Sequence, residues 1–370
     1  MSVLVEGERT FNLSRREGWD AFVAAPPRQQ PRSLDLAAGR ALRRKERLAY
    51  REERSVWHAN LGPIRTPQML QVIDGLAEIV AANRHDGDRV RSSAAIDALS
   101  GLGKTTIALQ FAKEFHREQL ALYGPVSAAG HDRIPVVYLR LAGRTTLRSL
   151  NQAVCEFYGL PRAHRGNAKE LGSRAADCAL SCGTRLFVVD DVHFLDPSRL
   201  DGRVVANQFK HLANEFQGTW LFVGVGLRER GLLSEGRSAA EGALAQTARR
   251  WTHLSVDPFQ ITTEEGRQWW RQLLLTVERQ LVLAEKDLGM LADHLAGYLF
   301  ARSTGHFESL MTLITRGCAR AITTGQERLT RELLDQVRND SAAEHARREL
   351  QAAIDRGTLK PYPDARQIAA

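Results

Sequence analysis

A phosphate-binding loop constrains the fold of this chain more than any other feature of its sequence. The run Ser100-Gly101-Leu102-Gly103-Lys104-Thr105-Thr106 follows an apolar stretch and precedes a helical pattern, and Ala98 stands at the first position of the motif, where glycine is usual. Glycine turns between a strand and a helix direct successive backbone N–H groups at a polyphosphate. We predict that the seven residues bind ATP, that Lys104 reaches its terminal phosphates and that Thr105 binds Mg²⁺.

Two aspartates after a second apolar run complete the predicted nucleotide site. Four consecutive apolar residues, 186–189, predict a strand buried on both faces, as a parallel sheet requires. Asp190 and Asp191 follow, at the strand end where ligands of open α/β sheets bind. We expect Asp190 to hold Mg²⁺ with Thr105, and Asp191 to orient or deprotonate the attacking water. The alternative is a strand that ends in two solvated turn aspartates.

The charge balance favours an anionic partner besides the nucleotide. The 370 residues carry a formal net charge of +8, which makes nucleic acid the first candidate. The start of the chain lacks the pattern of a secretory signal, and no apolar run reaches membrane-spanning length. The four cysteines do not form a metal-site pattern. We therefore expect a cytoplasmic protein with reduced thiols and no membrane partner.

The pattern divides the chain into four parts: a basic extension over 1–60, an ATPase core over 61–258, a helical lid over 259–338, and a helix and tail over 339–370. In the extension, the pattern over 34–54 predicts one charged helix. DNA, a neighbouring subunit and solvent are the alternatives for what this helix contacts. The core alternates strands and helices, which predicts a parallel sheet flanked by helices.

The expected elements follow from apolar periodicity and turn residues. Strands are predicted over 94–99, 134–139, 186–189, 219–223 and 252–256. Helices are predicted over 104–120, 146–158, 204–216, 286–302, 306–322 and 330–337, with a further helix opened by a capping box at 262–265. Trp269 and Trp270 recur with leucines at helical spacing, so we expect them to pack in a core rather than stack on bases.

A P-loop domain followed by a small helical lid resembles the AAA+ architecture. This resemblance implies that the nucleotide lies between two subunits and that an arginine from the neighbour neutralises charge during phosphoryl transfer. Arg249 and Arg250, just before Trp251, match the position of that arginine. The alternative is a surface arginine pair at a helix end.

Within AAA+ proteins, the order of four segments over 60–335 resembles the TniB/TnsC transposition regulators. The segments are Leu61-Gly62-Pro63-Ile64-Arg65-Thr66-Pro67, Tyr158-Gly159-Leu160-Pro161, Asp191-Val192-His193 and Ser303-Thr304-Gly305-His306-Phe307. The resemblance implies that ATP-bound subunits form a homo-oligomeric ring or filament on double-stranded DNA and recruit a transposase and a target-selection adaptor. Hydrolysis through Asp190, Asp191 and Arg250 would then dismantle the oligomer.

The same resemblance suggests where DNA would lie. Arg144, Thr145 and Arg148 follow the second strand, where related proteins face DNA. Backbone-tracking residues of this kind give salt-sensitive, largely sequence-independent binding. Ordinary helix capping plus solvated charge is the alternative role for the three residues.

Two departures from the family pattern bear on catalysis, and two other protein classes stay open. Asp191 replaces the usual glutamate with a carboxylate one methylene shorter, so we expect slow hydrolysis, and Gly305-His306-Phe307 in the lid offers no arginine to the nucleotide. The loop and the Asp190-Asp191-Val192 ending also resemble STAND-type signalling ATPases, including the NB-ARC group. A replication or helicase-loading ATPase would share the fold and the DNA partner.

Overall fold

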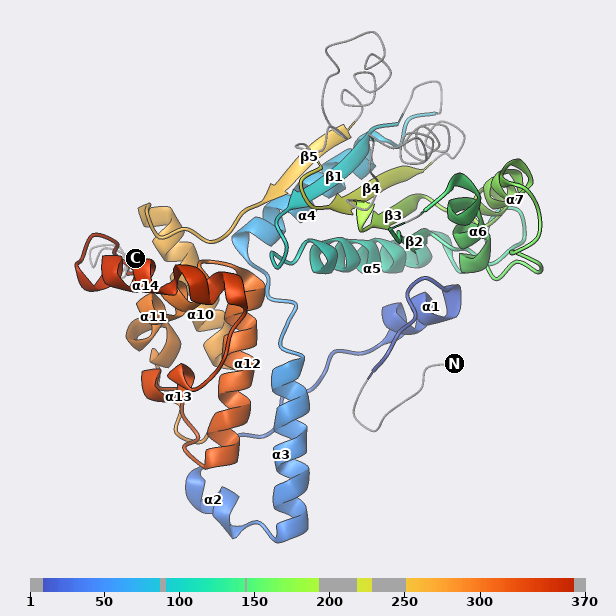
Figure 1. Ribbon diagram of the computed structural model, residues 1–370. Helices are drawn as coiled ribbons and strands as arrows, with labels where there is room; N and C mark the ends of the chain where they lie inside the picture. Colours follow the sequence, from blue (N-terminus) through green and yellow to red (C-terminus); the bar gives the residue numbers. More distant parts are fainter. Residues whose placement is uncertain (1–8, 87–90, 144, 193–217, 228–250, 363–370) are drawn as a thin grey trace.

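The computed structural model describes residues 9–86, 91–143, 145–192, 218–227 and 251–362. These residues build an α/β core and a helical C-terminal region that lie side by side and are joined by the N-terminal helices (Figure 1). Each region has its own cluster of buried apolar side chains. No helix within the described ranges is long and apolar enough to cross a membrane.

The α/β core is organised by one five-stranded parallel sheet. Its strands lie in the order β2-β3-β4-β1-β5, with bounds β1 Ser93–Ala98, β2 Val136–Arg140, β3 Leu186–Asp190, β4 Thr219–Gly224 and β5 Trp251–Val256. Every residue of β3 and β4 is buried, as their uninterrupted apolar sequences predict. The predicted parallel sheet is therefore confirmed, and all strands end at the same edge.

Helices cover the sheet. They are α4 Pro67–Ala82, α5 Lys104–Tyr123, α6 Leu147–Phe157 and α7 Ala168–Ser181. Helix α5 contacts four of the five strands, and α4 packs against β1 and β5. The sequence pattern predicted a helix around Cys178 without bounds, and α7 is that helix; the helix expected over 204–216 lies outside the described residues.

The C-terminal region is all helical, as expected. It comprises α10 Glu264–Gln280, a π-helix η2 Met290–His294, α11 Ala296–Ser303, α12 Phe307–Thr324, α13 Arg331–Asp335 and α14 Ser341–Asp355. Trp270 is fully buried and donates its indole N–H to the Ala296 carbonyl, so its predicted core role is confirmed. Thr263 caps α10 by accepting from Gly266 N–H, but the third helical position is this glycine, so the expected capping box does not form.

The prediction of a single helix over 286–302 is wrong. The chain instead forms a turn at Gly289, which adopts a φ of +79° that favours glycine, followed by η2 and α11. The buried Glu278 carboxylate accepts hydrogen bonds from the backbone N–H groups of Gly289 and Leu291, both at 2.7 Å. These bonds satisfy donors at the start of η2 and stabilise the break in the expected helix.

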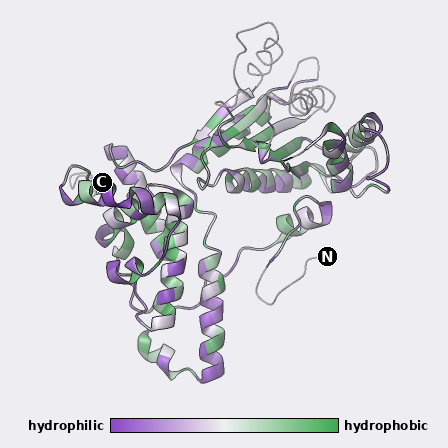
Figure 2. Ribbon diagram, viewed as in Figure 1, coloured by the Kyte–Doolittle hydropathy of each residue, from purple (hydrophilic) through white to green (hydrophobic). Residues whose placement is uncertain are grey.

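The basic extension also differs from expectation, because it forms three helices, α1 Arg16–Ala24, α2 Leu36–Ala41 and α3 Arg44–Ala59. The charged helix expected over 34–54 breaks before α3, where Arg43 is extended and its N–H donates to Glu46. Helix α1 packs against α5 of the core, whereas α3 packs against α12. Hydrophilic residues cover much of the length of α3 (Figure 2). The extension thus contributes to both regions.

Candidate nucleotide site

The predicted phosphate-binding loop connects β1 to α5 at the carboxyl edge of the sheet. Gly101 and Gly103 have φ values of +80° and +83°, a left-handed backbone that side chains other than glycine rarely adopt. Lys104 is the first residue of α5, and its side chain is largely buried. The loop therefore has the backbone turn and the helix N-terminus that polyphosphate binding requires.

Asp190 and Thr105 meet at this edge, as predicted. The Thr105 hydroxyl donates to Asp190 Oδ1 at 3.3 Å, and the carboxylate, only 1% exposed, also accepts from Tyr138 Oη at 2.8 Å and from Asp191 N–H at 2.9 Å. Burial and the adjacent Asp190 carboxylate raise the pKa of Tyr138, so its phenol stays a donor. A hydroxyl and a carboxylate held together provide the hard oxygen ligands that Mg²⁺ prefers, so the residues present fit this ion.

Asp191 is held by a residue that the sequence interpretation missed. Arg140 ends β2 directly opposite Asp190, and its Nε lies 2.6 Å from Asp191 Oδ2. Asp191 itself adopts a φ of +60°, which aspartate tolerates better than most residues. The carboxylate expected to activate water is thus paired with a guanidinium that is itself 68% exposed.

The helical region touches the phosphate-binding loop through the start of α12. Glu308 N–H donates to the Gly101 carbonyl at 2.9 Å, and a Cβ placed on Gly101 would lie 3.1 Å from Glu308 Oε2. The turn before α12 lies against the Phe259 backbone at Gly305, where a side chain would collide with the Phe259 carbonyl. A lid carboxylate therefore lies against the loop, and the sequence interpretation did not identify it.

A cavity of about 270 Å³ adjoins the loop where the two regions meet. Its lining combines the 60–64 segment and the start of α5 with the end of β5 and the lid, including the apolar side chains of Ile64, Ile107, Phe259 and Phe307. Such a mostly apolar cleft with a few polar groups suits a flat heterocyclic base. The phosphate loop and this cavity together form one candidate site for a nucleotide.

Several predicted site residues are not part of this constellation. Arg144, Arg249 and Arg250 lie outside the described residues. The Thr145 hydroxyl donates to the Ala142 carbonyl within a local turn. Arg148 donates to the carbonyls of His164 and Gly166 at 2.6 and 3.0 Å, so its guanidinium supports the loop after α6. The proposed DNA contacts of Thr145 and Arg148 stay predictions.

Comparison with known families places the loop and both aspartates inside a recognised domain. The family model described as an AAA domain matches residues 88–233, less than half of the chain. No curated protein sequence matches.

Similar solved structures include three ORC structures. The Aeropyrum pernix ORC1 protein in complex with DNA is 18% identical, with a TM-score of 0.55 over 79% of this chain and 67% of that one. The Aeropyrum pernix ORC2 protein in its ADPNP-ADP complexes is 15% identical, with a TM-score of 0.53 over 75% and 71%. Drosophila ORC bound to DNA is 14% identical, with a TM-score of 0.50 over 86% and 71%. At these identities the similarity bears on the fold, and the predicted AAA+ P-loop fold with a helical C-terminal region is confirmed.

Proposed function

We propose that this chain is an ATP-dependent AAA+ regulator of transposition that oligomerises on target DNA and recruits a transposase. The proposed ATP dependence rests on the contact between the two regions at the phosphate loop. There Glu308 N–H donates to the Gly101 carbonyl, beside the Thr105–Asp190 pair. A nucleotide in the loop and the adjoining cavity would touch both regions. Its presence would therefore favour one relative arrangement of core and lid over others.

The residues of the loop have separate roles in this proposal. Ser100 to Thr106 enclose the phosphates with Lys104 as the cation, while Thr105 and Asp190 hold Mg²⁺. The ion supplies charge neutralisation on the phosphate oxygens. Asp191 orients or deprotonates water once Arg140 no longer occupies its carboxylate, and Arg250, with Arg249 as the alternative, is supplied by a neighbouring subunit. Hydrolysis would then be slow and would release the oligomer.

A basic surface supports the DNA partner. Helices α2 and α3 and their connection carry six exposed cationic side chains between 36 and 51, against Glu46 in that range and Glu52 and Glu53 directly after it: Arg40, Arg43, Arg44, Lys45, Arg47 and Arg51. Arginine and lysine on one surface bind phosphates without reading sequence, at an affinity that falls with salt. We infer that this surface adds to the DNA contacts expected of Arg144, Thr145 and Arg148.

The transposition role rests on the segment order that resembles TniB/TnsC proteins. A replication-initiation or helicase-loading role is the second candidate, and the similarity in fold to the ORC proteins favours it. An integrase-type transposase gene beside the gene for this chain would support the first role. A replication origin or helicase gene in that place would support the second.

Electron microscopy of the purified protein with a slowly hydrolysed ATP analogue, with and without duplex DNA, tests the proposal. Rings or filaments that require both ligands are the expected result. Closed oligomers that form with nucleotide and ignore DNA would contradict it and favour a signalling switch.

Two variants separate binding from hydrolysis. Lys104→Ala removes the cation of the loop and should abolish ATP-dependent assembly, whereas Asp191→Asn should assemble normally and disassemble slowly. Sedimentation with ATP and DNA measures both effects. Normal oligomers from Lys104→Ala would show that assembly does not depend on this site.

The basic surface has its own test. The variant Arg44→Glu should weaken duplex binding and flatten its dependence on salt, while Arg348→Glu, at an exposed arginine of α14, makes the same charge change elsewhere. Equal loss in both proteins would mean that only net charge matters.

A further inference from the structure

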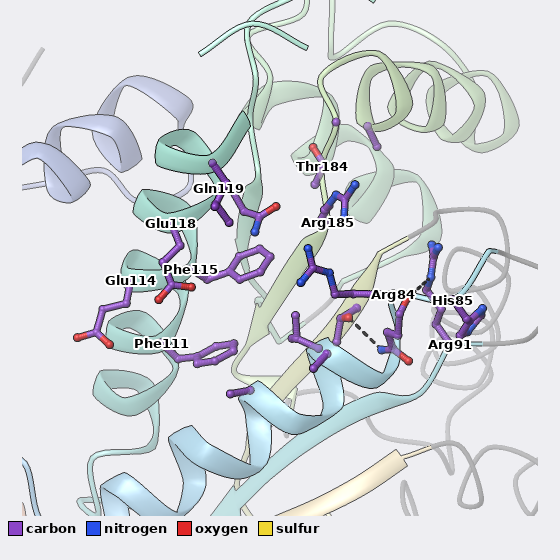
Figure 3. A pocket seen from close by; sticks show the side chains of 18 of the residues that line it. Arg84, His85, Arg91, Phe111, Glu114, Phe115, Glu118, Gln119, Thr184 and Arg185 are labelled. Carbon is purple, nitrogen blue, oxygen red and sulfur yellow. Dashed lines mark hydrogen bonds between the residues drawn. The ribbon is translucent and has the colours of Figure 1, made fainter. Parts of the chain in front are cut away.

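A second cavity lies at the amino-terminal edge of the sheet, away from the nucleotide site (Figure 3). It encloses about 580 Å³ between α4 and α5, and Thr184 and Thr219 at the starts of β3 and β4 border it. On α5, Phe111 and Gln119 of the lining stand 7 and 15 residues from Lys104, which places them about 10 Å and about 22 Å from the phosphate loop along this helix. It is separate from the proposed ATP site.

The wall formed by α5 has an apolar strip beside its polar residues Glu114, Glu118 and Gln119. Phe111, Phe115 and Leu122 from α5 line the cavity together with Val80 and Ala77 from α4. Leu122 is 67% exposed, unusually high for a leucine. The wall offers contact area for apolar side chains of a ligand.

Three arginines gather at one end of the cavity. Arg84 donates to Tyr123 Oη at 2.9 Å, Arg91 Nε donates to the Asn83 carbonyl at 3.0 Å, and Arg185 lies over the Tyr123 ring. None of the three has a carboxylate within ion-pair distance among the residues that the structure describes. Partial burial and, to a smaller degree, the nearby Arg185 lower the pKa of Arg91. Asp86 also lines the cavity, but among the described residues its carboxylate is not within ion-pair distance of these arginines, so their charge is available to a ligand.

Gln119 adds an unused amide. Its side chain is 8% exposed, lines the cavity and makes no hydrogen bond to any described residue. Figure 3 shows the amide directed into the cavity, between Phe115 and the arginines. An amide that opens into the cavity can both donate and accept hydrogen bonds, and a peptide main chain supplies both partners.

We infer that this cavity binds an acidic peptide segment of a partner protein, with carboxylates at Arg84, Arg91 and Arg185, main chain at Gln119, and an apolar side chain against Phe111 and Phe115. The inference goes beyond the proposed function and does not depend on ATP or DNA. Glu114 and Glu118 line the same cavity and would repel the continuous phosphates of a nucleic acid. A peptide carries its negative charge at chosen positions, so it can satisfy the arginines and avoid the glutamates.

Selection from a displayed random dodecapeptide library on the full-length protein tests the inference. We expect the wild type to enrich peptides that combine aspartate or glutamate with an aromatic or aliphatic residue. Fluorescence anisotropy of the most enriched peptide, labelled with fluorescein, then gives the affinity. Arg185→Glu should weaken binding about tenfold, because a hydrogen bond to a charged group contributes about 1.5–3 kcal/mol, and Gln119→Leu should weaken it about threefold, as for a neutral hydrogen bond.

Arg348→Glu makes the same charge change on α14 and should leave peptide affinity unchanged. Thermal unfolding and binding of the ATP analogue verify that each variant is folded. Failure to enrich acidic peptides, or equal affinity in the wild type and Arg185→Glu, would overturn the inference. Displacement of the labelled peptide by a short DNA duplex, with duplex binding lost in Arg185→Glu, would assign the cavity to nucleic acid instead.

Discussion

The α/β core and the helical region each bury side chains from one helix of the N-terminal extension. The buried contacts differ in chemistry between the two regions. In the core, α1 inserts Trp19, whose indole N–H donates to Nδ1 of the neutral His116 at 3.0 Å. In the helical region, α3 inserts Arg54, which makes a two-bond ion pair with Glu327 at 2.6 and 3.0 Å. The extension therefore contacts both regions, and residues 25–35 connect α1 on the core to α2 and α3 on the helical region.

The ion pair in the helical region gives the largest expected effect. Arg54 is 6% exposed, and Glu327→Gln would leave its charge buried without a full counter-charge. Breaking a buried pair from one side costs about 3–5 kcal/mol. Hydrogen exchange in denaturant should show this loss in α3 and α12, with the strands of the core unchanged.

The matched control is Asp287→Asn, which removes one charge from the exposed Arg328–Asp287 pair of the same region. It should change stability by less than about 1 kcal/mol. If Glu327→Gln lowered the stability of the core strands by the same amount, the two regions would unfold as one unit. The contrast between the two regions would then not hold.

Acid should weaken both regions, because each contains one buried histidine with a lowered pKa. Burial lowers the pKa of His58, beside α12, and of His116, on α5, to about 4, from an ordinary 6.5. The unfolded chain thus binds more protons between these values. The stabilisation is complete above pH 6.5 and decreases as the pH falls toward 4, by about 2 kcal/mol for each histidine at pH 5.

Single variants separate the two contributions. His116→Gln should flatten the pH dependence of the core alone, and His58→Gln that of the helical region alone, as measured by segment-resolved hydrogen exchange between pH 5 and 7. A glutamine oxygen can still accept the hydrogen bond from Trp19 or from Val282 N–H. Unchanged pH dependence in both variants would contradict the role of these histidines.

The comparison also explains what the sequence could predict. The phosphate loop, Thr105 and Asp190 were predictable, because a glycine turn, a helix start and a buried strand end are local patterns. Arg140 and Glu308 were not, since their roles depend on strand order and on where α12 begins against Gly101. The docking of α1 and α3 was missed for the same reason, because Trp19 and Arg54 find partners 97 and 273 residues away.

A smaller effect is expected at the core side of the nucleotide site. Arg140→Ala would remove the guanidinium that lies against Asp191. We expect the ATPase rate to rise about fivefold, because the variant removes a hydrogen bond that holds the Asp191 carboxylate. A charge-assisted hydrogen bond contributes about 1.5–3 kcal/mol, and the exposure of Arg140 reduces this contribution. Steady-state phosphate release measures the rate, Arg140→Lys serves as the control that retains the charge, and a fall in rate would place Arg140 within the hydrolysis machinery.

The smallest effect is expected where the lid meets the loop. Glu308→Gln removes the lid carboxylate near Gly101 and leaves the backbone N–H that contacts the loop. Two like charges about 6 Å apart in a solvent-exposed setting repel by about 0.7 kcal/mol, so ATP should bind about threefold more tightly. Titration of a fluorescent ATP analogue measures the change, and Glu285→Gln, on an exposed residue of the same region, is the control. If Glu308→Gln bound ATP more weakly, the carboxylate would stabilise the nucleotide-bound arrangement. The helical region would then contribute an acidic side chain to ATP binding.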